Sequence, residues 1–265
     1  MSIEYVLDFG CPVKEALTQE RLVALVKTRG QAQGLLEMLR ERGDTRPAHE
    51  IKVSRRRHTP RGDADSEEQS VQDMIDGTAE LNLHEPTCEG CAANACRRPF
   101  GCYGSVNYPI RVTTERWLLE RLPDNLGSPV GHLLRRACRD FGYDGGPFRK
   151  MRGDPMFFEQ DEPLACSWPL EDGGAWPITA NIVLQMLFGV GHLEPAHCVM
   201  TLWFLGALPH TADPSELGGF AGLKQLLSET EIPFASDDPQ VNQVIRFCGA
   251  MRAAALLDAT LLIDM

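Results

Sequence analysis

The chain has 265 residues, 43% of them hydrophobic and 24% charged, which is an ordinary composition for a globular protein. Its formal net charge of −11 disfavours non-specific binding of the whole molecule to a polyanion. The most apolar stretch, residues 178–208, is interrupted by polar residues and a proline, so neither half is long enough to span a bilayer. The N-terminus lacks a basic start followed by an apolar run. We therefore expect a soluble, cytoplasmic protein with no membrane partner.

The N-terminal third alternates between short apolar runs and one long helical pattern. Residues 5–9 predict a buried strand, and residues 18–42 repeat leucine and valine near helical spacing. Residues 50–58 predict a second strand. The Pro-, Gly- and Asp-rich residues 59–68 predict a mobile loop, and residues 70–81 a short helix. These elements lead into the segment with the clearest chemical signal.

Residues 84–110 contain four of the nine cysteines in the spacing C-x2-C-x4-C-x5-C. Thiolates suit zinc or iron–sulfur clusters, and a C-x2-C pair places two sulfurs on one tight turn. A histidine four residues before the first cysteine is a further candidate ligand. We predict a structural metal site, with zinc as the metal. Its candidate ligands are Cys88, Cys91, Cys102, and either Cys96 or His84.

Several alternatives to zinc stay open. The spacing differs from a zinc ribbon, which repeats C-x2-C, and from common iron–sulfur patterns, although an iron–sulfur cluster is the main alternative. Ordinary buried cysteines, a redox thiol pair and disulfides are others, although a reducing cytosol and an odd cysteine count disfavour disulfides. Cys102, in a glycine-flanked turn, is also a candidate nucleophile if the fold supplies a histidine base.

A basic segment follows the cysteines. Residues 97–152 hold 11 basic and 5 acidic side chains, whereas the rest of the chain is strongly acidic. Such a segment either packs against the acidic parts of the same fold or forms an anion-binding face. In the second case the partner is a protein, a small phosphate or a nucleic acid. The residues predicted to bind it are Arg97, Arg98, Arg111, Arg135, Arg136 and Arg139.

The middle of the chain predicts a strand at 103–112 and a helix at 113–122. A further helix begins with Ser128 as N-cap and Pro129 at the first helical position. Residues 143–176 are rich in glycine and proline, and we expect their acidic side chains to be solvated loop charges.

Two apolar helices follow, one at 179–188 and one beginning at Pro195. Because they are apolar nearly all round, we expect them at the centre of the fold. His192, His197 and Cys198 lie near their junction; a second metal site is conceivable there, but a hydrogen-bonded core histidine is favoured.

The C-terminal part predicts a helix at 218–227, then a helix capped by Asp238 and ending near Leu257. Residues 260–263 predict a final strand beside the first one.

Together these elements predict a helix-dominated α+β fold with few short strands and a cysteine-cluster knuckle. We expect one domain over residues 1–265, with an alternative boundary near residue 153. Common nucleotide-binding and hydrolase motifs are absent from the sequence. The favoured function is a cytosolic, zinc-stabilised binding or regulatory protein with a basic anion-binding face. The alternative is an iron–sulfur or cysteine-dependent enzyme that uses the segment from Cys88 to Cys102.

Overall fold

A computed structural model describes residues 2–58, 64–95, 98–155, 157, 159, 162–170 and 173–265. The predicted helix-dominated α+β fold is confirmed. The chain divides into two compact units. The larger comprises Met1–Phe9, Ala92–Arg97 and Gly101–Met265, and the smaller comprises Gly10–Cys91 and Arg98–Phe100. Both sides of residue 153 lie in the larger unit, and the expectation of a single domain stays a prediction.

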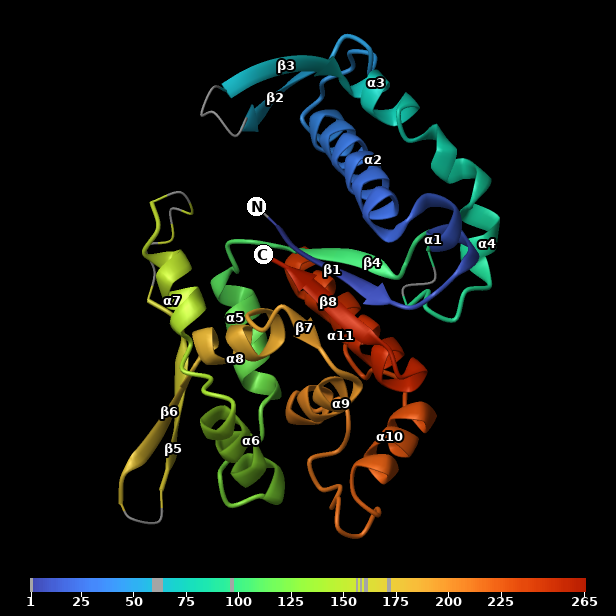
Figure 1. Cartoon of the computed structure of the whole chain (residues 1–265). Coiled ribbons are helices and arrows are strands. Elements are labelled where there is room, and N and C mark those ends of the chain that lie inside the picture. The colour runs from blue at the N-terminus through green and yellow to red at the C-terminus, as the bar shows by residue number, and fades with distance from the viewer. Residues whose placement is uncertain are drawn as a thin grey trace. The chain divides into compact units, whose positions relative to one another are not determined.

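The larger unit contains an antiparallel sheet in the order β4-β1-β8-β7 (Figure 1). Its strands are β1 (Ser2–Asp8), β4 (Tyr103–Asn107), β7 (His192–Leu193) and β8 (Thr260–Asp264). In the register, Val6 of β1 lies opposite Tyr103 of β4 and Leu262 of β8. The predicted pairing of the last strand with the first is therefore confirmed.

Helix α11 (Pro239–Leu257) packs against this sheet and carries much of the core. Asp238 caps it by accepting hydrogen bonds from the backbone N–H groups of Gln240 and Val241. On its buried face, the Phe247 ring lies 5.0 Å from that of Tyr5 and 4.6 Å from that of Phe188. These contacts join the sheet, α11 and α8 into one apolar core.

The two apolar helices are α8 (Ala180–Phe188) and α9 (Pro195–Phe204). Every residue of α8 except Gln185 is buried, and Trp203 of α9 is 2% exposed. The predicted central position of these helices is confirmed. Other helices of the larger unit are α5 (Val112–Arg121), α6 (Pro129–Asp140), α7 (Gly146–Arg152) and α10 (Phe220–Glu229).

Residues 143–176 are more ordered than their composition predicts. They include α7 and the hairpin formed by β5 (Ala165–Pro169) and β6 (Ala175–Thr179). The rings of Trp168 and Trp176 lie opposite each other on the hairpin, 5.6 Å apart. Cross-strand aromatic pairs of this kind stabilise a hairpin, and a loop prediction from composition cannot include them.

A buried ionic cluster holds the start of this hairpin. Arg152 donates to Asn181 Oδ1 at 2.8 Å and pairs with the carboxylates of Glu115 and Glu159. The other oxygen of Glu115 accepts the Leu164 N–H at 2.9 Å. The side chains of Glu115 and Glu159 are 1% and 6% exposed. The prediction that Glu159 is a solvated loop charge is therefore wrong, because an arginine from α7 compensates its burial.

The smaller unit consists of short elements around one long helix. Its elements are α1 (Pro12–Leu17), α2 (Gln19–Glu41), β2 (Lys52–His58), β3 (Ala64–Ser70), α3 (Val71–Asp76), the 3-10 helix η1 (Ala79–Leu83) and α4 (Glu85–Glu89). One apolar cluster includes Val13, Leu22, Leu81, Cys88 and Phe100. A second includes Ala32, Ile51, Val71 and Met74.

The predicted loop at 59–68 is partly wrong. Residues 64–68 belong to β3, which pairs with β2 along its whole length, whereas residues 59–63 lie outside the described residues. The backbone pairing sets Arg55 opposite Glu67 and Arg57 opposite Asp65.

No helix within the described part of the chain has the length and apolar character needed to cross a membrane.

Candidate functional site

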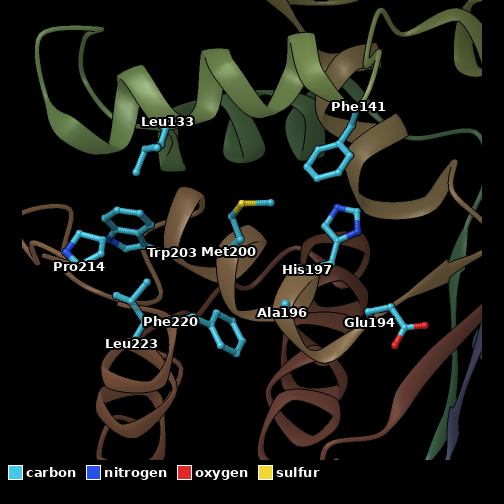
Figure 2. A pocket seen from close by; sticks show the side chains of 10 residues that line it. All are labelled: Leu133, Phe141, Glu194, Ala196, His197, Met200, Trp203, Pro214, Phe220 and Leu223. Carbon is cyan, nitrogen blue, oxygen red and sulfur yellow. The ribbon is translucent and has the colours of Figure 1, made fainter. Parts of the chain in front are cut away.

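The larger unit contains a pocket of about 540 Å³ between helices α6, α9 and α10 (Figure 2). Figure 2 shows side chains from these helices and from the adjoining loops around a common space, with the Glu194 carboxylate at its edge and pointing away from the other side chains. Its lining residues are Leu133, Phe141, Glu194, Ala196, His197, Met200, Trp203, Pro214, Phe220 and Leu223. The wall is therefore apolar and aromatic, with polar groups from Glu194 and His197.

Three nearly parallel rings form one end of this site. The His197 ring lies 5.7 Å from that of Phe141 and 6.1 Å from that of Tyr143, at interplanar angles of 21° and 15°. Phe141 is the C-cap residue of α6, and Tyr143 follows after a glycine with φ of 68°. The left-handed conformation at Gly142 turns the chain so that both rings lie near His197 on α9.

The His197–Tyr143 pair is uncharged at neutral pH. The hydroxyl of Tyr143 and Nε2 of His197 share a hydrogen bond of 2.8 Å. Burial, followed by the neighbouring His192, lowers the pKa of His197. Burial raises the pKa of Tyr143 to about 12. His197, which lines the pocket, is therefore a neutral imidazole held by a neutral phenol, and it offers a polar ring without adding charge.

Glu194 supplies a negative charge at the edge of the pocket. It is the N-cap residue of α9, but its side chain makes no capping hydrogen bond, and 61% of that side chain is exposed. Its carboxylate lies 3.6 Å from Nε2 of His192 and accepts a long hydrogen bond of 3.4 Å from the hydroxyl of Thr260.

Exposed aromatic side chains line this pocket. Phe141 is 58% exposed and Phe220 is 41% exposed, although both are large apolar side chains. Small-molecule sites are typically concave, mostly apolar and lined by a few polar groups, with volumes that include the value found here. Sequence reasoning expected His197 to be a core histidine and missed the pocket. The proximity of His192 and His197 was the available signal, but the aromatic walls come from distant segments.

The structure distributes the predicted metal ligands over both units. Cys88 is buried in α4 of the smaller unit, and the Cys91 N–H donates to the Cys88 carbonyl at 3.2 Å. The carbonyl of His84 accepts the Cys88 N–H at 3.3 Å. Cys102 is buried in the larger unit, where its carbonyl accepts the Leu7 N–H at 2.9 Å. Cys96 lies outside the described residues.

Cys11, which the sequence analysis did not select, is a neighbour of Cys88. It is the N-cap residue of α1, and its half-buried side chain packs against the apolar cluster that contains Cys88. Burial raises the pKa of Cys88, a backbone hydrogen bond from Phe100 acts in the opposite direction, and the nearby thiols of Cys11 and Cys91 raise it further. Within the described residues, no three His, Cys, Asp or Glu side chains form a group that could hold a metal ion. The metal site stays a prediction.

The predicted anion-binding arginines also fall in different places. Arg98 is exposed in the smaller unit, and Arg97 lies outside the described residues. Arg111 is the exposed N-cap residue of α5 in the larger unit. On α6, Arg136 and Arg139 each donate to Asp140 at 3.1 Å, and Arg135 is exposed on the same helix. Asp140 therefore offsets part of the positive charge of α6.

No known protein family matches the sequence, and no curated protein or solved structure matches the chain.

Proposed function

We propose that this protein binds a small apolar molecule in the pocket between α6, α9 and α10. The observation that carries this proposal is the combination of a 540 Å³ cavity with exposed aromatic walls. A ligand there covers Phe141 and Phe220, and the removal of apolar surface from water supplies the binding free energy. His197, held in place by Tyr143, offers a polar contact at one end that orients the ligand.

The test is a titration with the uncharged fluorophore N-phenylnaphthylamine, whose emission rises in apolar surroundings. We expect a dissociation constant on the order of 10–100 µM, as is reasonable for an unoptimised ligand of this size. Ala196 lines the pocket on the exposed side of α9, so Ala196→Phe should fill the space and weaken binding at least about tenfold, or 1.4 kcal/mol.

The matched control is Ala24→Phe, which adds the same ring at an exposed position of α2 in the smaller unit. This variant should bind the fluorophore like the wild type. No saturable binding to the wild type, or equal binding by the Ala196→Phe variant, would reject the proposed site.

We also propose that a metal stabilises the cysteine segment, with zinc favoured over an iron–sulfur cluster. Its support is the spacing of the cysteines and the packing of Cys11 against the cluster that contains Cys88 in the smaller unit. Binding to thiolates contributes directly to folding free energy at a structural zinc site. In this proposal the metal stabilises the cysteine segment and the pocket provides the binding function.

The test of the metal proposal is elemental analysis of anaerobically purified protein. Zinc in stoichiometric amounts with a colourless protein supports the zinc site, and a brown iron-containing protein supports the cluster. Cys88→Ser and Cys11→Ser should each lose metal and lower the melting temperature. Cys166→Ser, at a half-buried cysteine of β5 in the larger unit, is the control. Wild-type protein without bound metal would contradict this proposal.

A further inference from the structure

We infer that the ligand of this pocket is an amphiphilic amine, with its apolar body inside the pocket and its ammonium group at Glu194. This inference rests on the proposed function, because it specifies the chemical class of molecule that the pocket takes. Three observations support it: the charges that line the pocket, the availability of the Glu194 carboxylate, and the position of the aromatic rings.

The charges around the pocket favour a cation. Among the ten described residues that line it, Glu194 carries a negative charge and none is lysine or arginine. On α6, Arg136 and Arg139 pair with Asp140, and on α10, Lys224 pairs with Asp258. Arg135 of α6 is exposed and does not line the pocket. An anionic ligand therefore meets a carboxylate at the rim without a compensating cation from the lining, whereas an ammonium group meets its counter-charge.

The Glu194 carboxylate is available to a ligand. It does not cap α9, and its contacts to His192 and Thr260 are longer than 3.3 Å. The N-terminus of α9 adds a partial positive charge of about half a unit at this point. The full negative charge of Glu194 exceeds this partial charge, so the net field at the rim still attracts a cation.

The aromatic rings of the pocket suit a ligand with one charged end and one apolar end. The neutral His197 does not repel an ammonium group at the rim, and its ring stacks nearly parallel to that of Phe141. Exposed faces of Phe141 and Phe220 can also interact with a cation through their π electrons. The apolar body then packs toward Met200, Leu133 and Leu223 in the interior of the pocket (Figure 2).

The experiment compares three competitors with the same phenylbutyl body: 4-phenylbutylamine, 4-phenylbutanol and 5-phenylpentanoate. Each displaces bound N-phenylnaphthylamine in a titration at neutral pH and low salt. The amine should displace the fluorophore at a concentration about threefold or more below that of the alcohol, because exposed ion pairs contribute modestly. The carboxylate should be the weakest competitor.

Glu194→Gln should remove the advantage of the amine and leave displacement by the alcohol unchanged. Glu229→Gln, at an exposed glutamate of α10 outside the lining, should keep the wild-type order of competitors. Equal displacement by amine and alcohol in the wild type, or a preference that survives Glu194→Gln, would overturn the amine inference while the pocket stands. Failure of the fluorophore itself to bind would instead reject the proposed function.

Discussion

His197 has a neutral imidazole because two features of its surroundings disfavour the protonated ring. Burial removes the solvation that an imidazolium ion needs, and His192 adds a neighbouring positive charge when protonated. The hydrogen bond to Tyr143 fixes the ring at the polar end of the pocket. The lowered pKa makes His197 neutral at the pH where ligand binding is proposed.

This state predicts a pH-dependent stability. Because the pKa of His197 is lower in the folded protein, the unfolded chain binds more protons near pH 6. The free energy of unfolding should therefore fall as pH drops from about 6.5 through the lower folded-state pKa. Compared with the wild type, His197→Gln should lose less stability over this range in denaturant titrations. The control is His49→Gln at an exposed site, which should follow the wild type. Parallel pH profiles for wild type and His197→Gln would refute this role.

Arg152 illustrates a buried charge whose removal should be costly. Its guanidinium lies between Glu115 and Glu159, and the three side chains are 11%, 1% and 6% exposed. Arg152→Met leaves two buried carboxylates without their counter-ion and should cost about 3–5 kcal/mol of unfolding free energy. Arg149→Met on the exposed side of α7 should change it by about 0.5 kcal/mol or less. Equal stability of the two variants would show that the buried cluster contributes little.

Individual residues differ in how far the sequence predicts their roles. Cys88 and Cys91 were selected because their spacing is local, but Cys11 was missed because the fold alone brings it near Cys88. Glu159 was expected in solvent because the wider segment, residues 143–176, is rich in glycine, proline and acidic residues. Its partner Arg152 lies on α7, and ion pairing between segments leaves no periodic pattern in the sequence.

At the level of elements, α6 has two faces with different roles. Val130, Leu134 and Ala137 are buried, and Leu133 lines the pocket. The arginines predicted to bind anions, Arg135, Arg136 and Arg139, are exposed on the same helix. A helix of this kind can anchor the pocket on one side and meet an anionic partner on the other.

The proposal of an anionic partner can be tested with variants of the arginines on α6. If the partner is a nucleic acid, the protein should bind mixed RNA or single-stranded DNA at low salt, and the affinity should fall steeply as salt rises. Arg135→Ala combined with Arg136→Ala should weaken binding and reduce the salt dependence. The control is Arg149→Ala combined with Lys150→Ala on α7, which removes the same charge elsewhere. Absence of wild-type binding at low salt would exclude nucleic acid, while small anions and proteins need separate titrations.

Helix starts were predicted correctly where the sequence signal is local. Ser128 with Pro129, and Asp238 with Pro239, each place a capping side chain before a proline that fits the first helical turn. The hairpin β5–β6 and the strand β3 were missed because their stability comes from cross-strand partners. The composition of these segments predicted loops, but it did not predict the strand pairing on either side of them.

At the level of the molecule, the two units differ in what they supply. The smaller unit carries Cys11, Cys88 and Cys91, and the larger carries the pocket and Cys102. The pocket wall is assembled from residues between Leu133 and Leu223, in helices and turns far apart in the sequence. No short sequence motif corresponds to this wall, so the sequence predicted the apolar helices but not the pocket between α6, α9 and α10.

The proposed binding function is tested most directly by methyl-labelled NMR during titration with 4-phenylbutylamine. Met200, Leu133 and Leu223 supply methyl groups inside the pocket, whereas Leu22 and Met74, buried in the apolar clusters of the smaller unit, serve as control reporters. The proposal predicts saturable shifts at the three pocket residues and unchanged signals at the two reporters. Shifts centred on other residues, or no shifts at millimolar amine, would contradict it.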